Sequence, residues 1–325
     1  MKFRTEIDIP RGAVEIDHQS ELVLIGSCFS EEISAKFDYF KFSAFTNPFG
    51  ILFNPVSINN AVKHCVEGRT FDPSDLYFHQ NKWMSLYHHG SFDHSDPEKV
   101  LTLINRNIRK GQEAFQNATH VIITLGTSWV YRFRSNGNIV GNCHKIPQKE
   151  FTKELLSSEE IHANLKNMVS LIRKVNSNCT FLFTVSPVRH LKDGFIENTL
   201  SKALLQKAVH ELKKESEINY FPSYEIMVDD LRDYRFYKQD LVHPNEMAVD
   251  YIWELFKKSW ISESAKKDMI EIEGIQKSLA HKPFDRDSKE HQKFLLQLQG
   301  KIQNLKKRLP GVEFDAPPQS NHWVP

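Results

Sequence analysis

Short apolar runs separated by longer amphipathic segments dominate this chain, and they predict strands that alternate with helices. The apolar runs cover residues 21–27, 40–45, 119–125, 180–186 and 218–223. The first, third and fourth runs are rich in Val, Ile, Phe and Thr, a composition typical of strands buried on both faces. Because such alternation builds a parallel sheet covered by helices on both faces, we expect an α/β sandwich.

The segments between these runs repeat their apolar residues at helical spacing. One such face extends from Ile161 to Val175 and follows Ser157 and Ser158, whose hydroxyls suit a helix N-cap. Another covers residues 249–256, after Pro244-Asn245. These positions predict two helices that pack on the sheet.

An insertion follows the third predicted strand. The turn sequence Ser135-Asn136-Gly137-Asn138 separates two strand-like runs, residues 129–133 and 139–143. Asn-Gly between two such runs favours a β-hairpin. We expect this hairpin to rise from the end of the third strand.

From about residue 262 onward the pattern predicts helices, so we divide the chain into a domain of residues 1–261 and a C-terminal helical extension of residues 262–325. A narrow apolar seam runs along the last helix through Leu295, Leu298, Ile302, Leu305 and Leu309. The seam fits an α-hairpin that packs on the domain or a contact of two heptads between two copies. The chain is therefore expected to be a monomer or a homodimer through these helices.

Length, charge and cysteine content narrow the class of protein. The chain has 325 residues, of which 42 are basic and 41 acidic, and this balance gives no reason to expect nucleic acid or a membrane as a partner. Four cysteines without Cys-x-x-Cys spacing, no apolar leader and no run of about 18 apolar residues predict a cytoplasmic protein. No GxxxxGK[ST] or GxGxxG motif occurs, so no nucleotide cofactor is expected.

Polar residues follow the predicted strands, at the sheet edge where α/β proteins bind their ligands. Ser27 ends the first strand, and Asp240 and His243 follow the last one. A serine hydroxyl becomes a nucleophile when a histidine takes its proton and a carboxylate orients that histidine. These three residues are therefore a candidate triad for acyl transfer, with a helix N-cap as the alternative role for Ser27.

Residues near the fourth strand have competing interpretations. Arg189 is either a cation that binds a carboxylate or phosphate of the substrate or a structural ion pair. His190, with Asp193 three residues later, is a second candidate base. Cys28 is expected to be a small buried thiol rather than the nucleophile.

Four histidines gather in one segment, at His79, His88, His89 and His94. No HExxH motif or carboxylate at metal-ligand spacing accompanies them, so no metal is expected. The segment also carries Trp83, Tyr87 and Phe92, and we interpret it as a lid over the pocket.

Short motifs stand near the ends of the predicted strands. They are Gly26-Ser27-Cys28-Phe29-Ser30, Asn47-Pro48-Phe49-Gly50, Leu125-Gly126-Thr127-Ser128-Trp129-Val130, Asn142-Cys143-His144-Lys145, Ser186-Pro187-Val188-Arg189-His190, and Asp233-Tyr234-Arg235-Phe236-Tyr237 followed by the segment 240–244. Together they resemble the GSCFA-domain family of bacterial proteins over residues 3–310. The family is named for the motif that reads Gly-Ser-Cys-Phe-Ser here, with Ser30 in place of its final Ala.

This resemblance implies a fold and a chemistry. The family is grouped with the SGNH (GDSL-like) hydrolases, which implies a flavodoxin-like αβα sandwich and serine esterase activity. On that basis Ser27 is the nucleophile, His243 the base and Asp240 its orienter. The amides of Ser27 and Gly50 are then the expected oxyanion donors.

One departure from the wider superfamily concerns the oxyanion hole. The superfamily usually shows Gly-x-Asn-Asp after the third strand, whereas this chain has Gly126-Thr127-Ser128-Trp129. We expect Asn142 of the hairpin, or else Thr127 or Ser128, to supply the missing donor, whose loss would cost about 3 kcal/mol of transition-state stabilisation.

These observations predict a serine hydrolase that acts on an ester of a small or carbohydrate-linked substrate. Two alternatives stay open. The same triad serves an acyltransferase, and a domain that has lost its oxyanion asparagine can be a non-catalytic binding module.

Overall fold

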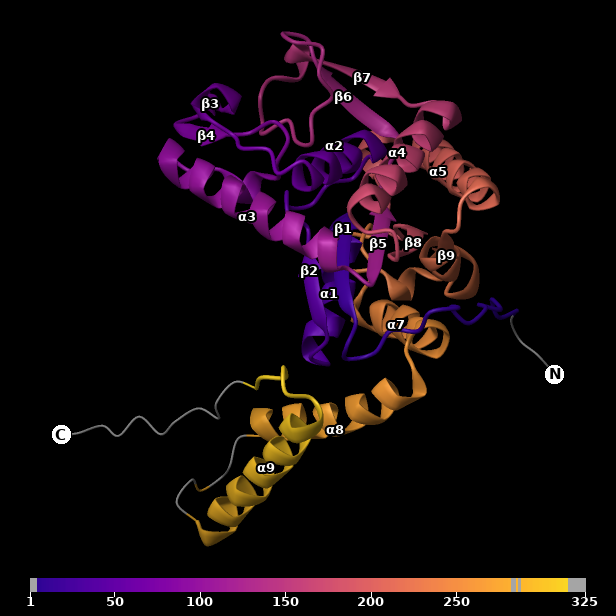
Figure 1. The fold of residues 1–325 in the computed structure, drawn as a ribbon. Coiled ribbons are helices and arrows are strands. Elements are labelled where there is room, and N and C mark those ends of the chain that lie inside the picture. Colours follow the sequence, from indigo (N-terminus) through magenta and orange to yellow (C-terminus); the bar gives the residue numbers. More distant parts are fainter. Residues whose placement is uncertain (1–4, 282–284, 286–287, 315–325) are drawn as a thin grey trace.

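A five-stranded parallel sheet forms the centre of the protein in the computed structural model, which describes residues 5–281, 285 and 288–314. The strands lie in the order β2 (Ser43–Thr46), β1 (Glu21–Gly26), β5 (His120–Leu125), β8 (Thr180–Val185) and β9 (Asn219–Phe221). Counted along the chain this order is 2-1-3-4-5, the flavodoxin-like arrangement of a doubly wound sheet. The predicted α/β fold with a central parallel sheet is confirmed (Figure 1).

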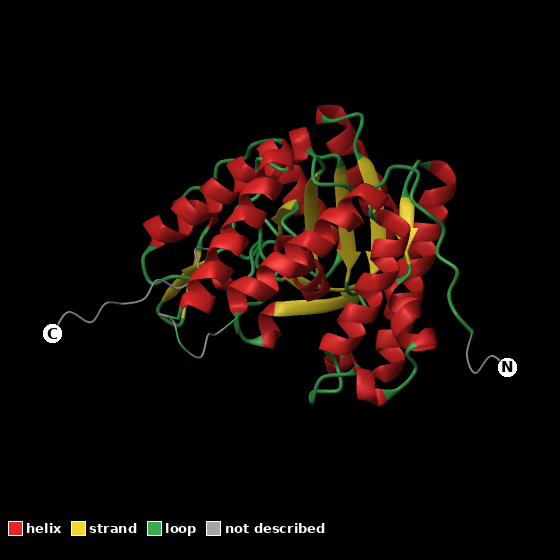
Figure 2. Cartoon of the chain, turned by 90° about the horizontal axis from the view of Figure 1, so that it is seen from below, coloured by secondary structure: helices red, strands yellow, loops and turns green. Residues whose placement is uncertain are grey.

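Side chains of the central strands alternate between two helical layers. Val23 and Ile25 of β1 belong to one apolar core, and Leu22 and Leu24 belong to the other. The first core is closed by α2 (Pro55–Val66), α3 (Pro97–Asn117), α4 (Ser158–Val175) and α5 (Phe195–Glu215). The second is closed by α1 (Cys28–Tyr39) and α7 (Glu246–Trp260). Figure 2 shows the strands enclosed by helices on both sides, which makes the three-layer sandwich.

Helix boundaries follow the capping residues of the sequence. Ser157 caps α4 in a capping box with Glu160, and Asn245 caps α7. The strand predicted at residues 40–45 begins later, at Ser43, because α1 continues to Tyr39. The residues between them form the turn that separates α1 from β2.

The insertion after β5 pairs differently from the prediction. Strand β6 (Trp129–Phe133) forms its ladder with β7 (Phe151–Leu155), whereas the predicted partner run meets β6 only at an antiparallel bridge between Arg132 and Ile139. The Asn-Gly turn does form, and Gly137 donates its amide to Phe133 O at 2.8 Å. Residues beyond Val140 leave β6 because the amides of Gly141 and Asn142 donate to Leu86 O. The predicted hairpin therefore forms at its turn and through Val140, but residues 141–143 do not continue it, and β7 is the longer partner of β6.

Smaller elements complete the ends of the sheet. A second hairpin consists of β3 (Tyr77–His79) and β4 (Lys82–Met84). It lies with β6 and β7 at one end of the molecule, opposite α8 and α9 (Figure 1). Short helical segments are α6 (Ser223–Glu225), Pro73–Asp75, Gly90–Phe92, Gln148–Glu150, Leu191–Asp193, Ile226–Asp230 and Tyr234–Phe236.

The C-terminal extension forms two helices, α8 (Glu263–Ala280) and α9 (Lys289–Arg308). Leu298 and Leu305 of the predicted seam are buried in the same apolar core as Met269 of α8 and Trp253 of α7. The arrangement favours an α-hairpin that packs on the domain, since the seam faces this chain. The last residues of the predicted extension, 315–325, lie outside the described residues.

An N-terminal segment straps the junction between α7 and α8. Ile16 forms an isolated parallel bridge with Ile261, and Ser262 donates its amide to Ile16 O at 3.0 Å. Nearby, Gly12 donates its amide to Ser259 O at 2.8 Å and lies so close to the Trp260 ring that a Cβ there would be 2.6 Å from it. Residues before the first strand thus hold the end of the last sheet-covering helix.

Candidate functional site

Ser27 lies at the switch point of the sheet, between the carboxyl ends of β1 and β5. Gly26 has φ +139° there, and a Cβ would lie 2.1 Å from Thr124 O, so only glycine lets the two strands approach. Ser27 then caps α1, its Oγ accepting from Phe29 N at 3.3 Å. The helix-cap role is therefore real. It leaves the hydroxyl proton free, because the oxygen accepts rather than donates in this bond.

Asp240 and His243 form a hydrogen-bonded pair on the loop before α7. Asp240 Oδ2 lies 2.7 Å from His243 Nδ1, and Asp240 Oδ1 accepts from the amides of Val242 and His243. The amides of His243 and Val242, and then the imidazole, lower the pKa of Asp240 to about 2. An ionised carboxylate only accepts, so Nδ1 carries the imidazole proton and Nε2 presents its lone pair.

Two tethers fix this loop to the site edge. Arg189, just past β8, donates its amide to Val242 O at 3.2 Å. Lys238 forms an ion pair at 2.9 Å with Glu32, which belongs to the helix that Ser27 caps. The structure thus ties the Asp240–His243 loop to the end of β8 and to α1, the helix that Ser27 caps. Ser27 itself has no exposed surface in this conformation.

The expected backbone oxyanion donors are already engaged. Ser27 donates its amide to Thr124 O at 3.1 Å, and Gly50 donates its amide to Asn47 O at 2.8 Å. Gly50 has φ +72°, and a Cβ would lie 2.5 Å from the Cβ of His89, so the glycine allows the His89 segment to cover this loop. Neither amide is a free donor as the structure stands, so each would have to leave its backbone acceptor to bind an oxyanion.

Thr127 and Ser128 are anchored on α5. Ser128 Oγ donates to Ser201 O at 2.8 Å, and Thr127 Oγ1 lies 3.0 Å from Ser201 Oγ while accepting from Trp129 N. Both side chains therefore connect the end of β5 to a helix. To serve as replacement oxyanion donors, these hydroxyls would have to leave their bonds to Ser201.

Asn142 keeps a free amide group. Its Oδ1 accepts from His144 N at 2.9 Å, and no hydrogen bond engages its Nδ2 within the described part of the chain. The Nδ2 atom lies 3.8 Å from the position that a Cβ on Gly90 would take, beside the segment that covers Gly50. Asn142 therefore retains an uncommitted side-chain donor, whereas Ser128 Oγ donates its proton to Ser201 O.

Lys202 is a site residue that the sequence analysis missed. It lies on α5 with 1% exposure, and its Nζ donates to Gly126 O at 2.6 Å and to Ser186 O at 2.8 Å, at the ends of β5 and β8. Burial lowers the pKa of Lys202 to about 7, against a smaller opposing effect of Cys28. Two carbonyl acceptors match the two hydrogens of a neutral amine. A lysine within a helical apolar pattern gave no sequence signal beyond its position opposite the strand ends.

Arg189 and His190 lie at the same edge. The Arg189 guanidinium stacks over Tyr237 at 4.1 Å and Tyr234 at 5.2 Å. No carboxylate pairs with it among the described residues, so the alternative of a structural ion pair finds no support. His190 Nε2 is buried and has no hydrogen-bond partner among the described residues. Burial, with the charges of Lys202 and His243, lowers the pKa of His190 to about 3.

The side chains of His190 and Asp193, the alternative base and its orienter, do not pair with each other in the described structure. Asp193 forms an ion pair at 2.5 Å with Lys153 of β7, and its only bond to His190 is between backbone atoms. His190 therefore lacks the carboxylate orienter that His243 has. His190 lies near His243 and lines the same edge of the sheet.

The histidine segment packs over the Asn47–Gly50 turn. His88 is fully buried and stacks on Phe49 at 4.0 Å, and burial lowers its pKa well below the ordinary value. His89 donates its amide to Phe49 O at 2.9 Å. Within the described residues no group of three or more His, Cys, Asp or Glu side chains is placed to hold a metal ion.

Cys28 is half-buried and follows Ser27 at the first position of α1. Burial raises the pKa of this thiol, with Lys202 opposing and Glu31 reinforcing the change. A neutral thiol is a weak nucleophile, so Cys28 is a poor candidate for the reacting group of this edge.

The fold and the site edge define a flavodoxin-like α/β protein with a serine at its switch point. The chain belongs to the GSCFA family: the model described as "GSCFA family" matches residues 21–256, and "GSCFA domain protein, C-terminal domain" matches residues 272–317. No curated protein matches the chain. Among the described residues no helix has the length and apolarity to cross a membrane.

Two solved structures are distantly similar. One is a Streptococcus pneumonia protein assigned provisionally as a platelet activating factor, with 10% identity, a TM-score of 0.41, and coverage of 76% of this chain and 84% of that chain. The other is an acetyl xylan esterase from the rumen bacterium Butyrivibrio proteoclasticus, with 11% identity, a TM-score of 0.36, and coverage of 74% and 64%. At this distance neither likeness bears on activity.

Proposed function

We propose that this chain is a serine hydrolase of the SGNH type, which cleaves an ester through an acyl-enzyme on Ser27. The observation that carries the proposal is the Asp240–His243 pair, 2.7 Å apart, on a loop tied to β8 and to the helix that Ser27 caps. Asp240 holds the Nδ1 proton, and the Nε2 lone pair is then the acceptor that a serine nucleophile requires.

The reaction proceeds in two balanced steps. Ser27 Oγ bonds to the ester carbonyl carbon as His243 Nε2 takes the serine proton. When the ester C–O bond breaks, His243 gives that proton to the leaving oxygen, which departs as an alcohol. Water then attacks the acyl-enzyme, giving its proton to His243, and Ser27 leaves as the alcohol. Asn142 Nδ2 is the proposed side-chain donor to the oxyanion, and the amides of Ser27 and Gly50 must exchange their present acceptors to join it.

A second candidate, acyl transfer to an alcohol or amine, has one observation in its favour. Ser27 is fully buried, so the loops that cover it must open to admit substrate and then exclude water when they close. Exclusion of water favours a bound acceptor over hydrolysis of the acyl-enzyme.

Labelling with a fluorophosphonate probe tests the nucleophile. We expect the wild-type protein to be labelled and Ser27→Ala to be inert. Ser30→Ala is the matched control, because Ser30 is also buried on α1 and its hydroxyl has no partner. Absence of labelling in the folded wild type, or equal labelling in Ser27→Ala, rejects the covalent mechanism and favours a non-catalytic binding module.

Partitioning of the acyl group separates the two candidates. With p-nitrophenyl acetate as substrate, added glycerol should leave acetate as the main product if the protein is a hydrolase. Acetylated glycerol in excess over acetate identifies a transferase.

A further inference from the structure

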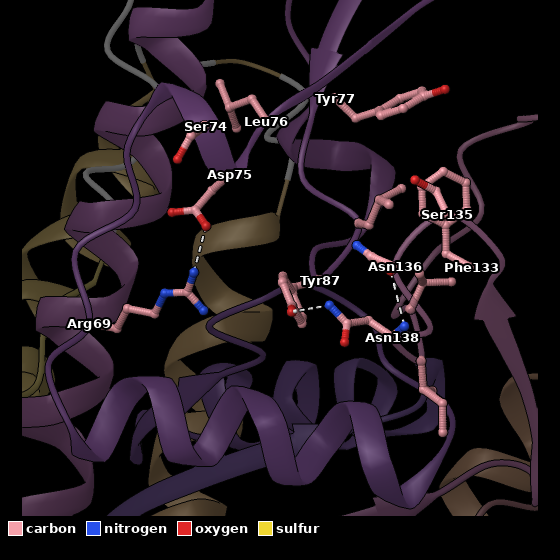
Figure 3. Close-up of a pocket in the computed structure, with 13 residues that line it drawn as sticks. Arg69, Ser74, Asp75, Leu76, Tyr77, Tyr87, Phe133, Ser135, Asn136 and Asn138 are labelled. Carbon is pink, nitrogen blue, oxygen red and sulfur yellow. Dashed lines mark hydrogen bonds and ion pairs between the residues drawn. The ribbon is translucent and has the colours of Figure 1, made fainter.

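A cavity of about 410 Å³ lies between the Pro73–Tyr77 segment and the β6 insertion, and the proposed reaction does not use it. Figure 3 shows side chains from both segments converging on it. Three aromatic rings line it, those of Tyr77, Tyr87 and Phe133. Tyr77 and Phe133 stand edge to face at 5.8 Å, which holds one wall rigid.

The charged side chains that line this cavity neutralise each other. Among the described residues that line it, Arg69 and Asp75 are the charged pair, and they lie 2.5 Å apart. Arg69 is held further by stacking over Phe71 at 4.3 Å and by a contact of 3.3 Å between its Nη1 and His64 Nε2. A cation fixed on a carboxylate offers little to a phosphate or carboxylate ligand, so the cavity suits an uncharged ligand.

Uncommitted amide and hydroxyl groups face the rings across the cavity. Asn138 Nδ2 lies 3.5 Å from Tyr87 OH, while its Oδ1 has no partner within the described residues (Figure 3). Asn136 accepts from Asn138 N through its Oδ1, which leaves its Nδ2 to donate. Ser135 adds a hydroxyl to the lining. Paired donors and acceptors of this kind match the hydroxyls of a polyol, each of which both donates and accepts.

The cavity adjoins the proposed catalytic edge through the chain. Tyr87 precedes Gly90 by three residues, and Val140 precedes Asn142 by two. At roughly 3.5 Å per residue these spans reach at most about 10 Å and 7 Å. A short oligosaccharide can therefore lie in the cavity while a substituent of a neighbouring sugar reaches the Gly50–Asn142 rim.

From the neutral lining, the aromatic wall and this adjacency we infer that the cavity binds a sugar residue of an uncharged oligosaccharide whose ester is the substrate. That the bound sugar belongs to the substrate rests on the proposed hydrolase function. The binding itself depends only on the residues of the cavity.

Calorimetry on the full-length Ser27→Ala variant tests the binding apart from catalysis. The probes are xylotetraose and cellotetraose, with tetragalacturonate as an acidic counterpart. We expect at least one neutral probe to bind, and Asn138→Ala or Tyr87→Phe to weaken its Kd by about 5- to 10-fold, the effect of one hydrogen bond. Lys149→Ala, an exposed change on the same insertion outside the cavity, is the control and should leave the Kd unchanged.

Three results overturn the inference: neither neutral probe binds, the cavity variants bind as tightly as the parent, or tetragalacturonate binds more tightly than the neutral probes. Fluorophosphonate labelling of Ser27 is a separate readout. Labelling without sugar binding refutes this inference alone, and sugar binding without labelling refutes the hydrolase alone.

Discussion

Replacing Lys202 by methionine should change how stability depends on pH. The side chain is buried, and a pKa of about 7 means that the folded protein holds it neutral in mildly alkaline solution. The unfolded chain keeps it protonated up to its ordinary pKa of 10.5. Between these values the unfolded state binds more protons than the folded state, so the free energy of unfolding rises with pH.

The magnitude follows from the shift. From about pH 7 to about pH 8.5 the neutral buried amine should add about 1.5 kcal/mol to the free energy of unfolding of the wild type. Methionine does not titrate, so the free energy of unfolding of Lys202→Met should not rise by this amount. It also leaves Gly126 O and Ser186 O without their donor, at a pH-independent cost of about 1–3 kcal/mol for each buried carbonyl.

Urea unfolding followed by tryptophan fluorescence, at a series of pH values and constant ionic strength, measures the difference. The window must end below about pH 9, because burial raises the pKa of Cys65 and of Cys179 to about 12, and stability from buried thiols is lost above their unfolded pKa of 9.0. Lys207→Met, an exposed change on the same helix, should run parallel to the wild type. A parallel curve for Lys202→Met as well would refute the reasoning, since Lys202 would then carry its charge inside the fold.

Other changes test the proposed site. Ser27→Ala should lower any esterase rate by orders of magnitude and the free energy of unfolding by only about 1 kcal/mol, the value of its cap on α1, and unchanged turnover would exclude the acyl-enzyme. His243→Ala should abolish turnover equally while leaving the melting temperature alone, because the side chain is 41% exposed; a large drop in melting temperature would point to a structural role. Asn142→Ala should lower kcat about 10²-fold with little change in KM, and a rise in KM alone would assign Asn142 to substrate binding. Treatment with EDTA should leave activity intact, and loss of activity together with stoichiometric zinc would contradict the metal-free mechanism.

The sheet could be predicted because its strands are locally distinct. Residues 119–125 and 180–186 are short runs of β-branched and aromatic residues bounded by polar turns, and β5 and β8 occupy almost the same bounds. The insertion could not be predicted in the same way. The Asn-Gly turn is a local signal that correctly predicts the pairing of Ile139 with β6, whereas the end of that pairing after Val140 depends on Leu86, a distant acceptor that draws Gly141 and Asn142 away.

The candidate site also has a part that local sequence predicts and a part that depends on distant partners. Asp240 and His243 are three residues apart, so one short segment of the sequence is enough to predict their pairing. The state of two oxyanion candidates depends on partners far along the chain: Thr124 O for Ser27, and Ser201 for Ser128. Lys202 escaped notice because a buried lysine is recognised only once its two carbonyl acceptors are in place.

The strap between Ile16 and Ile261 has a consequence for synthesis of the chain. The bridge joins residues 245 positions apart, so the N-terminal segment waits without its partner until the end of α7 has left the ribosome. Gly12 likewise waits for Trp260, whose ring packs against it, so this contact forms only near the end of synthesis. A fragment trimmed to residues 21–256, the bounds of the family match, lacks both halves of the strap and should be more prone to aggregate than the full chain.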